Sequence, residues 1–248
     1  MNIIVCISSV PDTTSKINFT DSGGKFDSDG VQFIINPYDE FGLTKAMMLK
    51  EANGGKVTVI TAGDVTVEPV IRKALAIGAD EAIRINMTPQ DSYSTAVEIA
   101  NYLKNNPADL VIAGRESIDY NGGAVGGMLA EMLDLPFINA CNGLHISGDT
   151  AEITREIDGG IENILTNLPF VISGQKGLVQ ESELRIPNMR GIMQARTKPL
   201  QVIEPLDNVH LTISSGFEKP ANKQDCKLVS SDNVADLVSL LRDEAKVI

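Results

Sequence analysis

The chain has 248 residues, enough for one large domain or two small ones, and 43% of them are hydrophobic and 22% are charged. Its net charge of −12 repels phosphate backbones and anionic lipid, so binding to nucleic acid or to a membrane surface is not expected. No apolar stretch is long enough for a membrane-embedded helix, and the apolar run after Met1 is too short and lacks the basic leader of a signal peptide.

Side chains that commonly carry chemistry are scarce. Cys6, Cys141 and Cys226 are far apart and form no C-x-x-C pair, which indicates reduced thiols and a cytoplasmic protein. His145 and His210 are the only histidines, and they are widely separated. A zinc site or a histidine-based triad is therefore not expected.

Strand and helix patterns alternate through the first half of the chain. Apolar runs predict buried strands at residues 2–7, 56–61, 81–85 and 109–113. Helices are expected at residues 37–52, 67–77, 92–105 and 122–133, the first with Asn36 as its cap and Pro37 at its first position. This alternation predicts an α/β fold with a doubly wound, mostly parallel, Rossmann-like sheet.

Ligands of such sheets bind at the carboxyl ends of the strands. In this sequence those ends are residues 6–9, 36–39, 61–64 and 113–124. The first strand is not followed by G-x-G-x-x-G, so the common dinucleotide motif is excluded. Between the first strand and the first helix, a turn at residues 10–13 and a small hairpin of residues 16–19 with 31–35 are expected.

A second hairpin is predicted in the middle of the chain. The alternating runs 151–157 and 161–165 flank Asp158-Gly159-Gly160, and Asp and Gly tolerate the positive φ of a tight turn. Pro169 then ends the strand, and residues 170–172 are expected to form a short buried strand.

The last part of the chain has weaker patterns. An exposed loop is expected at residues 174–190 and a strand at 199–203, and residues 204–227 have the character of an arm. A final helix is expected at residues 231–246. Its apolar face consists of Val234, Leu237, Val238, Leu241 and Ala245. The arm and helix could fold back on their own domain or embrace another subunit, and the stripe alone favours neither. We therefore divide the chain into a Rossmann-like domain, residues 1–185, and a loop and arm that ends in a helix, residues 186–248.

Residues 112–127 are the most ligand-like segment, because a strand, a glycine-rich loop and a helix follow one another there. Free amides at a helix start suit a phosphate group. The alternative is that Gly122, Gly123, Gly126 and Gly127 only allow close helix packing.

The order of residues from 153 to 173 adds a family resemblance. The fitting positions are Ile153, Arg155, Asp158, Gly159, Gly160, Glu162, Ile164, Pro169, Val171, Ile172 and Ser173. This order resembles the signature of the electron transfer flavoprotein beta subunit. The resemblance implies a Rossmann-like domain of the adenine-nucleotide-binding type and an electron carrier, not an enzyme.

The resemblance also implies partners and cofactors. They are an alpha subunit that shares an FAD with this chain, flavin-dependent dehydrogenases such as acyl-CoA dehydrogenase in fatty acid oxidation, and an acceptor such as a quinone oxidoreductase. The implied cofactor residues are Cys6, Thr13, Asn36, Pro37, Tyr38, Asp39, Ala62, Asp119, Asn121, Gly122, Gly123, Ala124 and Val125. Asn121, Gly122 and Ala124 stand where the family usually has Asp, Thr and Gln, so backbone amides must do more of the binding.

Residues 186–196 resemble the family's recognition loop, in which one protruding apolar residue anchors in a dehydrogenase. Met189 holds that position, with Arg190 and Ile192 beside it. The alternative is a surface loop with a buried Met.

The nucleotide held by this subunit is expected to be AMP, with a second FAD as the alternative. Residues 91–96 resemble the D-T-x-A-T motif that is associated with a second flavin, although Ser replaces Thr at 92 and Ala at 94. The segment also has the pattern of a plain capped helix, with Asp91 as the cap.

A second class of function is a stand-alone adenine-nucleotide-binding domain of the stress-protein or ATP-ligase type. It predicts ATP binding, a self-sufficient monomer and no visible colour. The absorbance spectrum of the protein purified with a partner subunit distinguishes the two.

Overall fold

The computed structural model describes residues 1–206, 209–222 and 226–248. The strands of the main sheet are β1 (Asn2–Cys6), β6 (Lys56–Ala62), β7 (Glu81–Ile85), β8 (Leu110–Gly114), β9 (Phe137–Ser147), β10 (Thr150–Ile157), β11 (Gly160–Asn167), β12 (Phe170–Gly174) and β13 (Leu200–Ile203). The helices are α1 (Pro37–Asn53), α2 (Glu68–Ile77), α3 (Ser92–Asn105), α4 (Val125–Leu133), α5 (Met189–Ala195) and α6 (Val234–Ser239).

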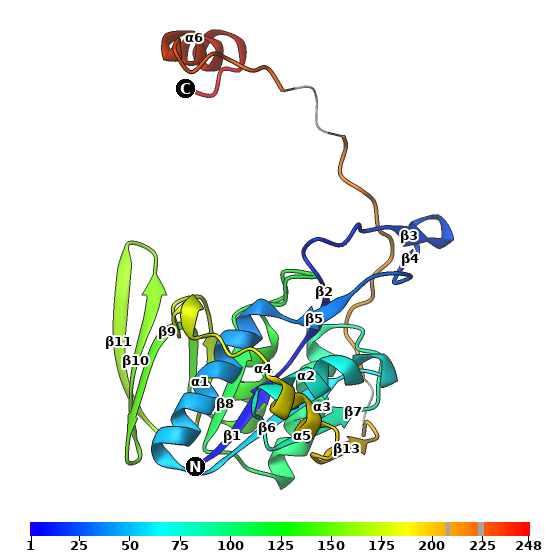
Figure 1. Cartoon of the computed structure of the whole chain (residues 1–248), viewed down its shortest axis with the longest axis vertical. Helices are drawn as coiled ribbons and strands as arrows, with labels where there is room; N and C mark the ends of the chain where they lie inside the picture. Colours follow the sequence, from blue (N-terminus) through cyan, green and yellow to red (C-terminus); the bar gives the residue numbers. More distant parts are fainter. Residues whose placement is uncertain (207–208, 223–225) are drawn as a thin grey trace.

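Within the described residues the sheet has nine strands in the order β11-β10-β9-β12-β8-β1-β6-β7-β13. Every pairing from β9 to β13 is parallel, and β10 and β11 are antiparallel (Figure 1). The predicted doubly wound, mostly parallel, Rossmann-like α/β fold is confirmed.

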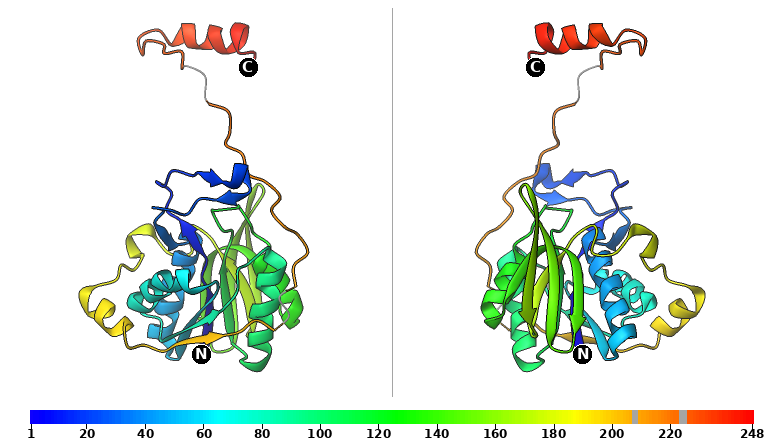
Figure 2. Two further views of the ribbon diagram at one scale, coloured as in Figure 1. Left: turned by 90° about the vertical axis from the view of Figure 1, so that its right-hand side faces the viewer. Right: turned by 90° about the vertical axis from the view of Figure 1, so that its left-hand side faces the viewer.

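Helices cover both faces of this sheet, as Figure 2 shows. Ile3 and Val5 of β1 belong to the larger core cluster, which includes residues of α1 and α2. Ile4 and Cys6 point the other way, into the cluster formed with α3 and α4. Because successive side chains of a strand alternate between faces, a continuous apolar strand such as β1 can fill both cores.

Several predicted elements are confirmed closely. β7 and α3 begin and end at the predicted residues, and α1 ends at Asn53 with Gly54 as its cap, whose φ of 71° suits a glycine. The predicted central hairpin is β10 and β11, with Ile157 opposite Gly160, so Asp158 and Gly159 form its turn.

The small hairpin after β1 was predicted with the wrong partners. Residues 33–35 form β5 (Phe33–Ile35), which pairs with β2 (Ser9–Pro11), so part of the expected turn at 10–13 is a strand. The other short pair is β3 (Phe19–Thr20) with β4 (Lys25–Phe26). Short runs carry little information about their partners, and here the pairing is between segments that are not adjacent in the sequence.

Other predicted boundaries were wrong in ways that have local causes. α4 begins at Val125, three residues after the expected start, because Gly122 pairs with Ser117 across the loop and Asn121 has a left-handed φ of 51°. The expected exposed loop at 174–190 begins inside β12, and Leu178 and Val179 within it are buried. It also contains a short 3₁₀ turn, Glu181–Glu183. The long strand β9 was not predicted.

The arm lies against its own domain for much of its length. Its start, β13, extends the sheet beside β7, and the backbone amide of Leu206 donates to Glu98 Oε2 at 2.8 Å. Further on, Phe217 stacks on Phe19 with ring centroids 5.2 Å apart. Residues 207–208 and 223–225 of the predicted arm lie outside the described residues.

The final helix is shorter than expected, since α6 passes into a π-helical segment, Leu240–Glu244. Figures 1 and 2 show it beyond the domain, and none of its described residues is buried. Its apolar face is therefore uncovered in the single chain. None of the helices in the described ranges has the length and apolar character needed to cross a membrane.

Candidate functional site

Asn36 and the first residues of α1 lie at the carboxyl edge of the sheet, where β8, β1 and β6 end side by side. Asn36 is only 1% exposed, and its Nδ2 atom donates to Asp39 Oδ1 at 3.1 Å and to the Glu116 carbonyl at 2.8 Å. Its Oδ1 atom accepts from the Ile118 amide at 3.2 Å. Asn36 was predicted to cap α1, but its side chain does not. It instead holds the loop after β8 against the helix.

Asp39 is buried next to Asn36. Its Oδ2 atom accepts a hydrogen bond from the Ser8 amide at 2.7 Å, so the carboxyl also fixes the end of β1. Burial raises the pKa of Asp39 to about 7, although hydrogen bonds from Ser8, Asn36 and Gly114 oppose the shift. Burial, together with the Asp39 charge, raises the pKa of Cys6 to about 12, which makes Cys6 an unreactive core thiol.

Gly114, the last residue of β8, allows the end of this strand to lie very close to the start of α1. A Cβ atom at this position would collide with Asp39 Oδ1 and lie 3.0 Å from Tyr38 Cβ. Only glycine allows the strand end to pass so near the start of α1. Cys6, Asn36, Pro37, Tyr38 and Asp39 are thus brought together with the loop after β8.

That loop has a defined shape. The Ser117 amide donates to the Gly122 carbonyl at 2.9 Å, and the Ser117 hydroxyl donates to Asp119, which also accepts from the Tyr120 amide at 2.9 Å. α4 then begins at Val125 with no side-chain cap on its first amides. A helix start without a cap, at the carboxyl edge of a parallel sheet, is suited to an anion.

Two roles were predicted for the glycines of this segment: close packing of the helix and backbone access to a ligand. The contacts of the four glycines differ in which role they fit. Gly126 and Gly127 pack against the Phe137 ring, where added Cβ atoms would lie 3.2 and 3.3 Å from ring carbons. Gly122 and Gly123 lie in the loop before α4 and have no such contact with an apolar side chain. Close packing therefore explains the second pair, and backbone access to a ligand remains the role expected of the first.

The end of β6 contributes Ala62, and the neighbouring strand β7 contributes a buried arginine that sequence reasoning missed. Arg84 is only 5% exposed, and its Nη1 atom donates to the Gly63 carbonyl at 3.0 Å and to Asn86 Oδ1 at 2.8 Å. It holds the turn after Ala62 in place. The only signal in the sequence is a basic residue inside an otherwise apolar strand. Next to Ala62, the Thr61 hydroxyl is buried without a partner among the described residues.

Thr13 and the segment at residues 91–96 were also considered as cofactor contacts, and their surroundings differ from those of the residues above. Thr13 lies exposed just after β2. Asp91 caps α3, since its Oδ1 atom accepts from the Ser94 amide at 2.8 Å, and the Ser94 and Thr95 hydroxyls donate to the Asp91 carbonyl. α3 begins at the same edge, with Ser92 Oγ 3.8 Å from a Cβ built on Gly122.

The predicted partner-binding residues lie elsewhere, on α5. Met189 is 75% exposed and Ile192 is 42% exposed, so the alternative of a buried Met is wrong. Asn188 Oδ1 accepts from the Gly191 amide at 2.8 Å and caps the helix. Met189, Arg190 and Ile192 thus belong to a short capped helix on the surface.

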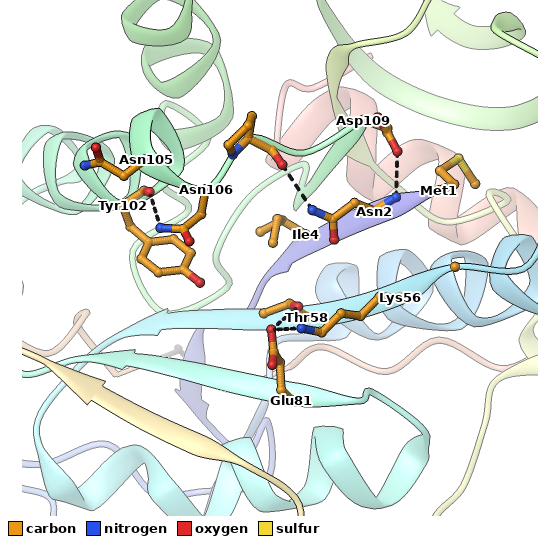
Figure 3. Close-up of a pocket in the computed structure, with 12 residues that line it drawn as sticks. Met1, Asn2, Ile4, Lys56, Thr58, Glu81, Tyr102, Asn105, Asn106 and Asp109 are labelled. Atoms are coloured by element: carbon orange, nitrogen blue, oxygen red, sulfur yellow. Dashed lines mark hydrogen bonds and ion pairs between the residues drawn. The ribbon is translucent and has the colours of Figure 1, made fainter.

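A hollow in the described residues lies at the opposite, amino edge of the sheet (Figure 3). It has a volume of about 690 Å³. Its polar groups contact one another: Glu81 accepts from Lys56 and Thr58 at 2.5 and 3.0 Å, and Asp109 accepts from the Asn2 amide at 2.6 Å. Because its charges are already paired and no helix begins there, we assign the site to the carboxyl edge.

The fold and this edge define a class: doubly wound α/β domains, whose ligands bind where parallel strands end. No cluster of metal-ligating side chains occurs in the described part of the chain. The family model of the electron transfer flavoprotein domain matches residues 23–208.

Three relatives are named electron transfer flavoprotein subunit beta. The Bacillus subtilis protein is 38% identical over the whole of both chains. The Syntrophomonas wolfei protein is 38% identical over 81% of this chain and 78% of its own, and the human protein is 28% identical over 100% of this chain and 99% of its own. The chain therefore belongs to the electron transfer flavoprotein family, among its beta subunits. The stand-alone nucleotide-binding class is set aside.

Proposed function

We propose that this chain binds AMP at the carboxyl edge of its sheet and, with an alpha subunit, holds a redox-active FAD that receives electrons from flavin-dependent dehydrogenases. The observation that carries the nucleotide site is the uncapped start of α4, which faces a loop held by Asn36. Bound FAD would supply the electron-transfer chemistry, and the protein would bind and orient it.

The residues of this edge fit a nucleotide monophosphate. The amides at the start of α4 would bind the phosphate, with Gly122, Gly123 and Ala124 leaving the backbone accessible. Ala62 lies at the end of β6, where the adenosine would bind. Asn36 acts indirectly, because the two donors of its amide and its oxygen are already engaged within the protein.

The contacts of Asp91 favour AMP over a second FAD. Its Oδ1 atom caps α3, and its Oδ2 atom accepts from the amides of Leu211 and Thr212 in the arm. The Ser94 and Thr95 hydroxyls also bond to the Asp91 carbonyl. These groups are therefore engaged within the chain and not free for the diphosphate of a longer nucleotide.

Residues 186–248 would form the parts that meet other proteins. α6 exposes Val234, Leu237 and Val238, and an exposed apolar face needs a cover, which we assign to the alpha subunit. Met189 would anchor the dehydrogenase, with an acyl-CoA dehydrogenase as the expected donor and a quinone oxidoreductase as the expected acceptor. Residues 1–185 would form the nucleotide-binding domain of a cytoplasmic protein.

Co-expression with an alpha subunit tests this proposal. We expect the two chains to elute from size-exclusion chromatography as a one-to-one complex with flavin absorbance, and this chain alone to aggregate. A stable, colourless monomer that does not associate with the alpha subunit would contradict the proposal.

A further inference from the structure

A groove lies on the surface where α2 and α5 pack together, beside Met189. Its volume is about 510 Å³, and Pro69, Pro187 and Ile192 form its apolar walls. Three basic residues, Arg72, Lys73 and Arg196, also line it. A basic groove is unusual on a chain with a net charge of −12, so its charge carries information about what it binds.

The walls of the groove are fixed by reciprocal contacts between the two helices. Arg72 of α2 donates through Nη1 to the carbonyls of Ala195 and Lys198, at 2.7 and 2.9 Å. Lys198 donates through Nζ to the carbonyls of Leu75 and Ala79, at 2.9 and 2.6 Å. Arg72 thus satisfies carbonyls at and just after the carboxyl end of α5, and Lys198, which follows α5, satisfies carbonyls at and just after the carboxyl end of α2. Helices leave such groups free.

Close packing at Gly191 adds to this rigidity. A Cβ atom at this position would collide with the carbonyl oxygen of Ala76 in α2. The two helices therefore approach as nearly as their backbones allow, and the groove beside them is preformed. A preformed groove costs a partner less ordering on binding than a mobile loop would.

The three cations of the groove are not equally available. Arg72 is engaged with the carbonyls of α5, and Lys73 pairs with Glu40 at 2.8 Å. Arg196 is exposed, and across the described ranges its guanidinium has no ion pair or hydrogen bond. One free guanidinium at an apolar groove suits a single carboxylate beside an apolar side chain.

We propose that this groove receives an apolar side chain of the electron-donating dehydrogenase, with a neighbouring carboxylate of that partner on Arg196. The proposal rests on the proposed function, because it needs a dehydrogenase partner. Docking is then reciprocal: Met189 inserts into the partner, and the partner inserts a side chain into the groove beside α2 and α5. Two insertions beside each other fix the orientation of the complex, which a single anchor cannot do.

The test measures the second-order rate constant for reduction of the purified heterodimer by an acyl-CoA dehydrogenase that reduces the wild type. Arg196→Glu is compared with Lys104→Glu, an equal charge change at an exposed residue near the end of α3. We expect Arg196→Glu to lower the rate constant on the order of tenfold at low salt, with the difference shrinking at high salt. Lys104→Glu should change it by less than about twofold, and neither variant should alter the flavin spectrum.

Ala76→Leu tests the apolar half, because it fills the groove from the α2 side. It should lower the rate constant without changing its salt dependence, and hydrogen exchange of residues 189–195 reports whether α5 stays in place. Equal rates for Arg196→Glu and Lys104→Glu would overturn the groove proposal. If Met189→Ala slows reduction while Arg196→Glu does not, the groove proposal is wrong and the proposed function is unaffected. If no flavin-dependent dehydrogenase reduces the wild-type heterodimer, the proposed function fails.

Discussion

The Oδ2 atom of Asp91 accepts a hydrogen bond from the backbone amide of Leu211, 120 residues further along the chain, at 2.7 Å. The next amide, of Thr212, donates to the same oxygen at 2.8 Å. The other oxygen caps α3. One carboxylate therefore starts a helix at the carboxyl edge of the sheet and fastens the C-terminal arm to it.

Asp91→Asn should release the arm and leave α3 intact. Asn caps helices about as well as Asp, but its NH₂ group cannot accept from the amides of Leu211 and Thr212. We expect faster hydrogen exchange in peptides that cover residues 209–216 and unchanged exchange in α3. If the arm peptides stay protected in the variant, Asp91 does not hold the arm.

The arm contact should not respond to pH near neutrality. Burial works to raise the pKa of Asp91, but hydrogen bonds from Ser94, Leu211 and Thr212 outweigh it and hold the pKa well below its ordinary value of 3.8. A lowered folded-state pKa gives stability that is present above the unfolded value and is lost as the pH falls through the folded value. Arm protection, corrected for intrinsic exchange, should therefore be constant from about pH 5 to pH 8, and a loss within that range would contradict the assignment.

Asp39 should make stability depend on pH in the opposite sense. Its folded-state pKa is raised from 3.8 to about 7, so the folded protein holds this proton more tightly than the unfolded chain. The resulting stabilisation is full below about pH 4 and is lost as the pH rises toward 7. Asp39→Asn removes this titration.

Urea unfolding of the wild type and Asp39→Asn between pH 4 and pH 7 checks this. The free energy of unfolding of the wild type should fall relative to the variant by about 1.4 kcal/mol for each unit of pKa shift. The difference measured at the lowest pH, where Asp39 is neutral, is the internal reference. Parallel curves for the two proteins would mean that Asp39 is not protonated in this range.

Gly114→Ala should destabilise the protein and weaken nucleotide binding at the proposed site. The new methyl group would collide with Asp39 Oδ1, and relieving such a collision in a packed region costs roughly 1–3 kcal/mol. Gly160→Ala is the matched control, because nothing lies within 4 Å of a Cβ atom there, so its effect should stay within about 0.5 kcal/mol. Equal thermal midpoints for the two variants would show that the strand end can move away from α1.

Met189→Ala should slow electron transfer from the dehydrogenase without changing the flavin spectrum. Loss of a central apolar anchor costs roughly 2 kcal/mol of binding, which is about 30-fold in affinity. Met193→Ala removes a side chain of the same kind that is 68% exposed on the same helix. If Met189 is the single anchor, only Met189→Ala should slow electron transfer strongly. Equal slowing by Met193→Ala would indicate that any loss of apolar surface on this helix has the same effect.

Much of the fold could be predicted because its signals are local. Asp158-Gly159 specifies a tight turn, and the capping box of Asp91 with Ser94 marks where α3 begins. β9 was missed because its pattern is interrupted: Ala140 has a left-handed φ of 55°, and the register with β12 shifts there. A bulge breaks the alternation from which strands are recognised.

The site was predicted only in part, because its key contacts join distant segments. Asn36 has the sequence pattern of a helix cap, yet its amide bonds residues 80 and 82 positions away. The hydrogen bond from Arg72 to the carbonyl of Lys198, 126 positions further along the chain, could not be predicted from the sequence either. Such contacts are decided by how the elements pack and not by local propensity.

The nucleotide content of the purified heterodimer tests the central claim most directly. Acid extraction followed by chromatography should release one FAD and one AMP for each pair of subunits. Two flavins and no AMP would show that the edge held by Asn36 and Asp39 binds a second FAD, and a complex without flavin would contradict the account as a whole.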